Sequence, residues 1–494
     1  MFLFEVKMFT FKVSIQIKKR KDKIIMSKQQ NKNTHSLNSN VIFVIGALGG
    51  LLFGFDTGII SGASPLIEKA LHLTISEISF VTSAVLIGSC VGALTIGGLS
   101  DKYGRKLLLF ISSILFIIGA LMSAFAPNFV VIVIARIILG LAVGSASALT
   151  PAYLAELAPK ERRGSLETLF QLMITAGILL AYMANIGFLH HNIAGWADWR
   201  WMLATAFIPA LALFIGSIIL PESPRFLIRV GRVEESHKVL TQLRPDYTSE
   251  QIEGELRDIQ NADSEVHKGG VKELFTIARP ALVAAIGIML FQQLVGINSV
   301  IYYLPQVFIE GFHFSASSAI WISVGIGVVN FLSTIVATII MDKFPRKKLL
   351  IWGAFVMGVS LAILSVINYT INIETAATYT IILIAIYIFG FAVSWGPIAW
   401  VLIGEIFPLS VRGVGSSFGS AANWLGNFIV TQFFLIILAL FHNNVGGPFG
   451  IFAIFSFLAI PFVMRFVPET HGKSLEQIQD ELLEGSKTKH KEAK

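Results

Sequence analysis

The sequence is poor in charge and almost free of cysteine. Only 14% of its 494 residues are Asp, Glu, Lys or Arg, whereas about a quarter of the residues in a soluble domain are charged. The single cysteine, Cys90, excludes an intramolecular disulfide framework and a multi-cysteine metal site. Hydrophobic residues make up 54% of the chain and the mean hydropathy is +0.72. We therefore expect a membrane protein.

Motifs for metal-dependent catalysis and nucleic-acid binding are lacking as well. The ten histidines include no His-x-x-x-His pair, and the adjacent His190 and His191 fall in a short predicted loop that favours solvation. The formal net charge is +7, but basic residues flank apolar stretches and do not form one solvated face. We expect neither an enzyme nor a nucleic-acid-binding protein, and no cofactor or metal ion.

Long apolar runs are the dominant feature of the chain. Crossing the hydrocarbon core of a bilayer takes about 20 mostly apolar residues. Such runs lie at 41–62, 79–100, 107–126, 129–153, 166–189, 201–220, 281–309, 317–341, 349–369, 379–404, 413–441 and 447–467. We predict an all-α membrane protein with twelve transmembrane helices. Because that number is even, both termini should face the same side.

Basic residues predict which side that is. Lys and Arg concentrate in the loops after the even-numbered runs, at Lys102, Arg105, Lys106, Lys160, Arg162, Arg163, Lys343, Arg346, Lys347, Lys348 and Arg412. The alternate loops contain Lys69 and Arg200 and little else. Since loops rich in Lys and Arg remain in the cytosol, both termini are predicted to be cytosolic in a multi-pass protein of the cell membrane.

The runs divide the chain into five segments. These are a leader, 1–40, a first six-helix half, 41–220, a cytosolic linker, 221–280, a second six-helix half, 281–467, and a cytosolic tail, 468–494. The linker is predicted to contain short helices, and we prefer it to an independent regulatory domain. The polar composition of the leader predicts that it is disordered. Residues 1–25 are either a weak amphipathic segment or an upstream extension of the true start.

Three motifs recur in the same order in the two halves. Asp101-Lys-Tyr-Gly-Arg105 corresponds to Asp342-Lys-Phe-Pro-Arg346, Glu156 with Arg163 to Glu405 with Arg412, and Pro221-Glu222 to Pro468-Glu469. This repetition indicates duplication, so we expect two six-helix halves related by a pseudo-two-fold axis around a site near the midplane. Within the first run, glycine recurs at 46, 50, 54, 58 and 62, which predicts close helix packing.

The repeated motifs place acids and bases at predicted cytosolic helix ends. We predict a charge network of Asp101, Arg105, Glu156, Arg163, Glu222, Arg225, Asp342, Arg346, Glu405 and Arg412. Topology signals alone explain Lys and Arg but not the recurring Asp and Glu. We interpret the network as a latch between the halves, with ion pairs that form in one conformation and break in the other.

Further motifs support a family resemblance. They include Gly54-Phe55-Asp56-Thr57-Gly58, Gln292-Gln293-x-x-Gly296-Ile297-Asn298, Tyr302-Tyr303, Trp395-Gly396-Pro397 and Glu405-Ile-Phe-Pro408. With these motifs in order, nearly the whole chain after residue 40 resembles the sugar porter family of the major facilitator superfamily, and its bacterial proton-coupled symporters in particular. Ile178 departs from some bacterial relatives, which have a second glutamine there. The sugar therefore stays open among glucose, galactose, xylose, arabinose and inositol.

A sugar site needs amides that donate and accept hydrogen bonds and an aromatic face for the C–H groups of the ring. The resemblance places these residues around a central cavity: Phe53, Gln171, Gln292, Gln293, Asn298, Asn330, Trp400, Asn423 and Trp424. Gln293 and Asn298 do not share a face of a straight helix, so we expect a break near Gly296. Tyr302 and Tyr303 are interpreted as an outer gate. For any single amide, an ordinary interhelical hydrogen bond is the alternative.

Two charged residues, Asp56 and Arg136, lie deep in apolar runs, where charge is costly and marks function. A partner cation favours the charged carboxylate, and loss of that partner favours protonation. The pair can thus couple proton uptake to helix movement, or it can be a fixed structural ion pair. The resemblance implies import of a monosaccharide by proton symport, for which a monomer suffices. A passive uniporter and a non-transporting membrane sugar sensor are the alternatives.

Overall fold

The computed structural model describes residues 39–159, 163–191, 195–265, 271–276, 278–341, 343–408 and 411–471. The secondary-structure elements of these residues are helices. The first half contains α2 (Ser39–Gly46), α3 (Leu48–Ala70), α4 (Ile75–Tyr103), α5 (Arg105–Ala124), α6 (Phe129–Leu157), α7 (Arg163–Phe188), α8 (Asp198–Thr205) and α9 (Phe207–Ile219). Between the halves lie α10 (Pro224–Arg229), α11 (Val233–Leu243), α12 (Ser249–Glu265) and α13 (Val271–Phe275). The second half contains α14 (Arg279–Leu294), α15 (Ile297–Phe312), α16 (Ala316–Ile340), α17 (Arg346–Thr370), α18 (Ile373–Ala392), α19 (Trp395–Glu405), α20 (Arg412–Leu440) and α21 (Gly446–Phe466).

Twelve helical stretches of the described chain are long and apolar enough to cross a membrane. Each coincides with one of the twelve predicted runs, so the prediction of an all-α protein with twelve transmembrane helices is confirmed. Four of these stretches consist of two successive helices, namely α2–α3, α8–α9, α14–α15 and α18–α19. The break between α14 and α15 falls at Gly296, where the sequence predicts one.

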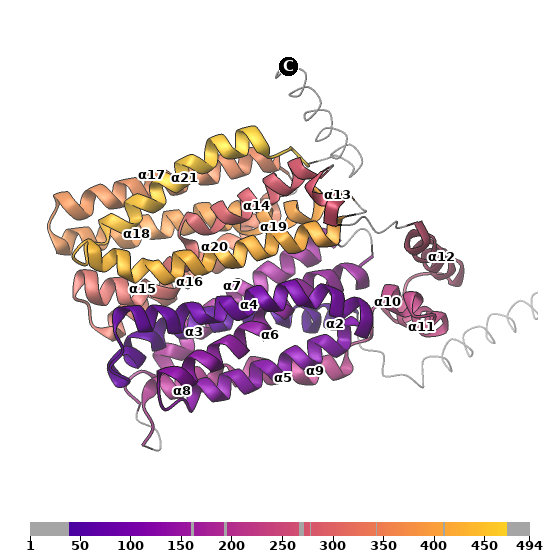
Figure 1. The fold of residues 1–494 in the computed structure, drawn as a ribbon, viewed down its shortest axis with the longest axis horizontal. Coiled ribbons are helices and arrows are strands. Elements are labelled where there is room, and N and C mark those ends of the chain that lie inside the picture. Colours follow the sequence, from indigo (N-terminus) through magenta and orange to yellow (C-terminus); the bar gives the residue numbers. More distant parts are fainter. Residues whose placement is uncertain are drawn as a thin grey trace, which may run out of the picture.

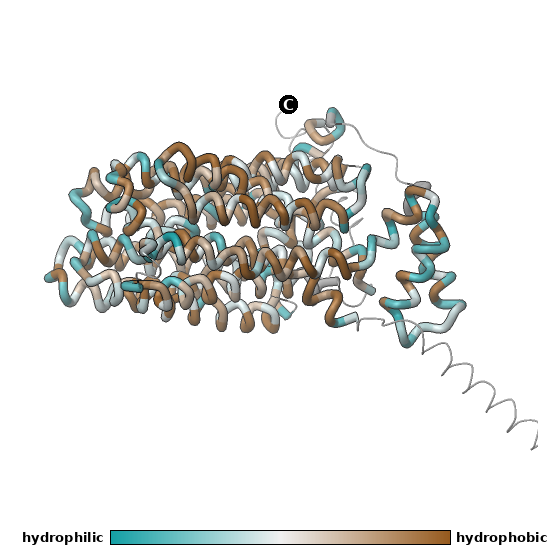
Figure 2. Tube along the Cα trace, turned by 90° about the horizontal axis from the view of Figure 1, so that it is seen from below, coloured by the Kyte–Doolittle hydropathy of each residue, from teal (hydrophilic) through white to brown (hydrophobic). Residues whose placement is uncertain are grey.

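The two halves lie side by side, with the indigo-to-magenta helices of the first half in one layer and the red-to-yellow helices of the second in the other (Figure 1). Helices α10, α11 and α12 project beyond one end of the bundle, which we call the linker end. In Figure 2 the bundle is largely hydrophobic along its length, whereas these projecting helices are rich in hydrophilic residues. This distribution suits a bundle in lipid whose linker lies in water.

Four glycines of the stripe, from Gly50 to Gly62, lie where α3 packs against α7, whereas Gly46 ends α2 and faces Leu154 of α6. A Cβ atom on Gly54 would stand 1.8 Å from the backbone oxygen of Ile174, and one on Gly58 would stand 2.7 Å from that of Ile178. Both distances are shorter than any real Cβ contact, so each glycine is required by its neighbour's backbone. The two helices therefore pack backbone to backbone, as the four-residue spacing predicts.

The halves meet mainly along three helix pairs, α3–α15, α4–α20 and α7–α16, with a smaller contact between α7 and α19. Ser83 Oγ donates a hydrogen bond to Gln432 Oε1 at 2.7 Å, and Gln306 Nε2 donates one to Glu68 Oε2 at 2.9 Å. These two hydrogen bonds join the halves at the end away from the linker.

Candidate functional site

One cavity between the halves brings together most of the predicted sugar ligands. It is lined by Phe53, Gln171, Ile174, Thr175, Ile178, Gln292, Gln293, Ile297, Asn298, Ile301, Asn330, Phe391, Ala392, Gly396, Trp400 and Asn423. Eight of the nine predicted substrate residues are in this set. The ninth, Trp424, is buried and packs against Phe53 with ring centroids 5.2 Å apart, so it supports an aromatic wall.

Two helix breaks build the cavity. Gly296 has φ +92°, a left-handed conformation that glycine adopts without strain, and it separates α14 from α15. The turn brings Asn298 back to the end of α14, where its Nδ2 donates to Gln293 Oε1 at 2.8 Å. The second break, between α18 and α19, places Gly396 and Trp400 on the cavity wall. Side chains that a straight helix would hold apart therefore converge.

Four of the five predicted amides of the second half, Gln292, Gln293, Asn298 and Asn423, form one connected network. Asn423 Nδ2 donates to Gln292 Oε1 at 2.5 Å, and Gln293 Nε2 donates to the same oxygen at 3.3 Å. Gln292 Nε2 in turn donates to the backbone oxygens of Trp395 at 2.9 Å and Gly396 at 3.2 Å. Burying an amide is costly unless it is hydrogen-bonded. A satisfied network of this kind holds each member in one orientation.

The apolar part of the wall was not predicted from the sequence. It consists of Ile174, Ile178, Ile297, Ile301, Phe391 and Ala392, and the polar Thr175 and Gly396, at the helix break, complete the wall. Nearly all of these residues come from apolar runs, in which a side chain that faces a cavity looks the same as one that faces lipid. Gly396 and Ile297 belong to motifs of the sequence, and Ile178 departs from some bacterial relatives, but the sequence analysis did not place any of the three on the cavity wall.

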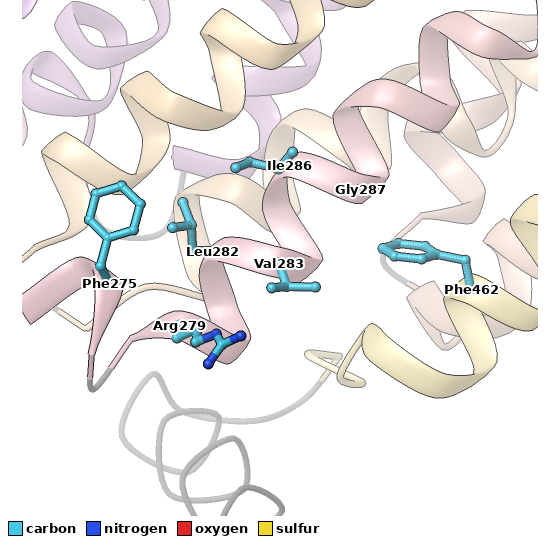
Figure 3. Close-up of a pocket in the computed structure, with 7 residues that line it drawn as sticks. All are labelled: Phe275, Arg279, Leu282, Val283, Ile286, Gly287 and Phe462. Carbon is cyan, nitrogen blue, oxygen red and sulfur yellow. The ribbon is translucent and has the colours of Figure 1, made fainter.

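A second pocket lies at the linker end of the second half, between α13, α14 and α21 (Figure 3). Phe462 points toward Gly287 across it, and Arg279 is its one charged residue. The remaining lining side chains are apolar. A sugar requires several convergent polar groups, so this pocket is not the candidate site.

Asp56 on α3 and Arg136 on α6 form an ion pair inside the first half. Arg136 Nη1 lies 2.5 Å from Asp56 Oδ1, and the two residues are 0% and 2% exposed, respectively. Asp56 follows Phe53 by about one helical turn, so the pair adjoins the cavity. Within the described part of the chain, Nε and Nη2 of Arg136 have no hydrogen-bond partner.

The two tyrosines predicted as a gate are buried on α15. The Tyr303 hydroxyl donates to the backbone oxygen of Thr431 at 3.1 Å, and its ring stacks on Phe434 with centroids 5.5 Å apart. Both tyrosines follow Asn298 along α15 toward the end away from the linker, and a gating role stays a prediction.

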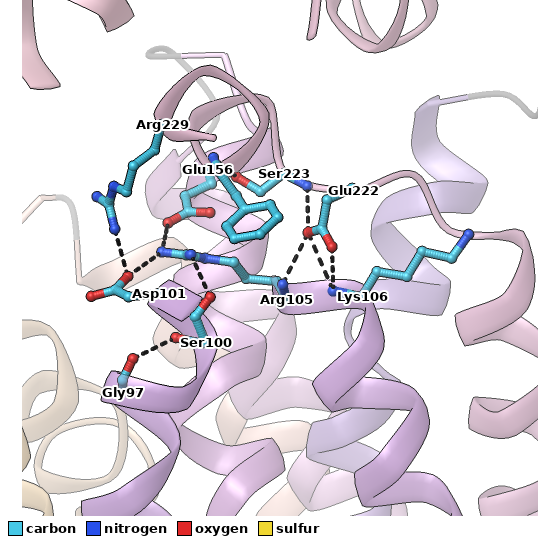
Figure 4. Close-up of polar contacts among 10 residues, drawn as sticks. Gly97, Ser100, Asp101, Arg105, Lys106, Glu156, Glu222, Ser223 and Arg229 are labelled. Carbon is cyan, nitrogen blue, oxygen red and sulfur yellow. Dashed lines mark hydrogen bonds and ion pairs between the residues drawn. The ribbon is translucent and has the colours of Figure 1, made fainter. Parts of the chain in front are cut away.

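Arg105 is the centre of a charge network at the linker end of the first half (Figure 4). Its Nη2 lies 3.0 Å from both Asp101 Oδ1 and Glu156 Oε1. Glu222 Oε1 accepts hydrogen bonds from the backbone N–H of Arg105 at 2.9 Å and of Lys106 at 3.3 Å. Glu222 therefore caps the amino-terminal end of α5, where a carboxylate is favoured by the free N–H groups and the helix dipole.

The second half repeats this arrangement. Glu469 accepts hydrogen bonds from the backbone N–H of Arg346 at 3.0 Å and of Lys347 at 3.1 Å, at the start of α17. Arg346 Nη1 pairs with Glu405 and also donates to Thr470 Oγ1 at 2.8 Å. The repeated motif contains Glu469, but its capping geometry depends on α21 ending beside α17, which no local pattern specifies.

The structure describes only some of the other residues that were predicted to belong to the charge network. Asp342 lies outside the described residues, as does the side chain of Arg163. Arg225 is exposed, and Arg229, one turn later, makes an ion pair of 2.7 Å with the aspartate of the Arg105 network. Arg412 donates to a backbone oxygen of its own half. These described contacts stay within one half and its adjoining linker, so a latch between the halves stays a prediction.

Glu222→Ala is expected to destabilise the protein by about 1–2 kcal/mol, because it removes the cap of α5. The measurement is the thermal unfolding midpoint of the purified protein in detergent. Arg225→Ala, an exposed change three residues later, is the control and should leave the midpoint unchanged. Equal midpoints for the two variants would show that the Glu222 cap contributes nothing to stability.

Comparisons with known proteins agree with this geometry. A family model described as "Sugar (and other) transporter" matches residues 42–482. The chain is 45% identical to a D-xylose transporter of Levilactobacillus brevis over 446 residues, 90% of this chain and 95% of that protein. It is 37% identical to the galactose-proton symporter of Escherichia coli K12 over 466 residues, 93% of this chain and 98% of that protein. The solved structure of the proton:xylose symporter XylE bound to 6-bromo-6-deoxy-D-glucose is also similar, with a TM-score of 0.77 and 33% identity over 90% of this chain and 99% of XylE.

Proposed function

This chain belongs to the sugar (and other) transporter family, and on that premise we propose that it imports a monosaccharide together with a proton. The proposal includes alternating access to the cavity between the halves and no chemical change to the sugar. The connected amides, with Trp400 and the Phe53–Trp424 pair, supply the hydrogen-bonding groups and aromatic faces that a sugar ring needs. The named relatives carry xylose or galactose, which makes these two sugars the first candidates.

The observation that carries the proton-coupling part is the buried Asp56–Arg136 pair beside the cavity. A carboxylate without its partner in a low-dielectric interior favours the protonated form. Movement of α3 relative to α6 would therefore link separation of the pair to proton uptake. Because Phe53 and Asp56 share α3, the same movement would alter the sugar site.

The proposed orientation follows from the positive charge at the linker end. Arg105, Lys106, Arg346 and Lys347 all lie there, and such clusters remain on the cytosolic side. We therefore place the linker and both termini in the cytosol and the protein in the cell membrane. One copy of the chain contains the whole cavity, so we propose a functional monomer.

The test of this proposal is uptake by vesicles that contain the purified protein. With an inward proton gradient, radiolabelled D-xylose or D-galactose should accumulate above its external concentration, and a protonophore should abolish the accumulation. Equilibration without accumulation would make the protein a uniporter. Saturable binding of a sugar with no flux at all would identify a sensor.

Gln293→Ala and Asn298→Ala should each weaken sugar binding by about 2- to 12-fold, equivalent to about 0.5–1.5 kcal/mol. Each change removes hydrogen-bonding groups from the cavity wall, so the loss should appear in ligand affinity more than in the thermal unfolding midpoint. Titration calorimetry on purified protein measures the affinity. Wild-type affinity in both variants would place the sugar elsewhere.

A further inference from the structure

The apolar pocket between α13, α14 and α21, which we call the α14–α21 groove, opens on the side of the bundle (Figure 3). It has a volume of about 440 Å³ and follows α14 from Arg279 to Gly287, which is about 12 Å of helix. On its walls, Val283 is 41% exposed and Phe275 is 52% exposed. Because α14 and α21 belong to membrane-spanning stretches, this side faces lipid, and hydrocarbon chains rather than water cover it.

An aromatic side chain closes the deep end of the groove. A Cβ atom on Gly287 would stand 1.9 Å from Phe462 Cζ, so the glycine lets this ring lie against the backbone of α14. Phe462 also packs on Phe291 and on Phe466, with ring centroids 5.1 and 5.2 Å apart, respectively. These contacts hold the ring in place. A ligand therefore reaches the groove from the lipid side or from the linker end.

Two arginines flank the groove on the side of the linker end. Arg279 is the first residue of the membrane-spanning stretch that α14 begins, and Arg465 is the last but one of the stretch formed by α21. Arg465 follows Phe462 by about one turn, and its guanidinium carbon lies 5.8 Å from the centre of the Phe466 ring. Both arginines are exposed, and neither forms an ion pair with another described residue. The apolar groove therefore ends at two cations at the level of the lipid headgroups.

We propose that the α14–α21 groove binds one anionic phospholipid, with an acyl chain against Val283 and Ile286 and its phosphate between Arg279 and Arg465. Basic pockets between transmembrane helices on the cytosolic side suit such headgroups, and the linker end is the end that we place in the cytosol. A zwitterionic lipid carries its own cation, which the two arginines repel. A soluble anion gains nothing from the apolar wall, and a sugar offers no chain to cover it.

Titration of the purified protein in detergent with two lipids tests the proposal. Dioleoyl phosphatidylglycerol and dioleoyl phosphatidylcholine have the same chains and differ in headgroup charge, and native mass spectrometry measures the dissociation constant of the first bound lipid. Each arginine near the phosphate should contribute about 5-fold, so the wild-type protein should prefer phosphatidylglycerol by about 25-fold. Equal constants for the two lipids would overturn the proposal. Glycerol phosphate has the anionic charge without a chain, and competition by it at equal concentration would make the ligand a soluble anion.

Three variants locate the bound lipid. Arg279→Gln and Arg465→Gln should each reduce the preference for phosphatidylglycerol about 5-fold. Val283→Trp fills the groove from an exposed position and should reduce the preference to about 5-fold or less, because the chain that positions the phosphate is displaced. Lys102→Gln is the matched control. Lys102 is also the last residue but one of a membrane-spanning stretch, and its Nζ lies 5.1 Å from the centre of the Tyr103 ring, but it belongs to α4 in the other half. This variant should keep the wild-type preference.

The other outcomes contradict the proposal in different ways. An equal loss in Lys102→Gln and in the arginine variants would show that the positive linker end attracts anionic lipid without a defined site. Retention of the full preference in Val283→Trp would place the lipid outside the groove. A dimer in the same spectra that Val283→Trp abolishes would assign the groove to a second copy of the chain. None of these measurements involves a sugar, so their result is independent of the proposed function.

Discussion

Asp56→Asn should abolish accumulation of sugar against a gradient while sugar exchange across the membrane continues. With one proton per sugar, a difference of one pH unit supports about 10-fold accumulation. In the variant this ratio should fall to one, because asparagine cannot bind and release a proton in the physiological range. The cavity amides, Trp400 and the Phe53–Trp424 pair are unchanged in this variant, so sugar can still bind and cross.

The contacts of Arg136 distinguish this expectation from that of a fixed structural ion pair. Arg105 at the linker end pairs with two carboxylates and also donates to a backbone oxygen, which ties it to its surroundings. Arg136 has the single described partner Asp56, and among described residues its Nε and Nη2 have none. Separating a buried pair costs about 3–5 kcal/mol unless the remaining charge is neutralised. Proton binding to Asp56 neutralises one of the two charges.

Vesicles with an imposed pH difference supply both measurements. Net uptake against the gradient tests coupling, and counterflow of labelled sugar at equal pH tests movement through the site. Asp246→Asn makes the same chemical change at an exposed position of the linker and should accumulate sugar like the wild type. If Asp56→Asn still concentrates sugar when a proton gradient is applied, Asp56 is not the coupling site.

The transmembrane helices were predictable because lipid imposes a length and an apolar composition on every span. The breaks within these helices were harder to predict. Gly296 was found because Gln293 and Asn298 could not otherwise converge. The break before α19 also had a local signal, since Pro397 lacks the N–H that would bond the Val393 carbonyl in a continuous helix. The interruption at Ala206 has the same signal in Pro209, which lacks the N–H that would bond the Thr205 carbonyl, whereas the interruption at Ala47 has no proline beside it.

The candidate site was predictable in its residue types but not in its connections. Costly amides and charges in apolar runs stand out from sequence alone, as Asn423 and Asp56 do. Which atoms they bond is decided by helices far apart in the chain. Gln292 and Asn423 are 131 residues apart, and their hydrogen bond depends on α14 packing against α20. The capping role of Glu222 depends in the same way on where α9 ends relative to α5.

Gly54→Ala should destabilise the protein by about 3 kcal/mol, because its new methyl group would lie 1.8 Å from the backbone oxygen of Ile174. A flexible side chain could move aside, but a backbone oxygen moves only if α3 and α7 separate. The expected result is a sharply lower thermal unfolding midpoint in detergent, or loss of monodisperse protein. Gly98→Ala on α4 is the matched control, since its methyl group meets no atom within 4 Å and alanine favours the helix.

A graded series tests the cause of this effect. A methyl group on Gly58 would lie 2.7 Å from the Ile178 backbone oxygen, a milder overlap than at Gly54, so Gly58→Ala should lower the midpoint by a smaller amount. If close approach of the two backbones is the reason for the glycine stripe, stability should fall in the order Gly98→Ala, Gly58→Ala, Gly54→Ala. Equal midpoints for the three variants would mean that α3 and α7 tolerate separation. Because α3 carries Phe53 and Asp56, any separation that the fold survives should also weaken sugar binding, and calorimetry on the Gly58 variant measures that consequence directly.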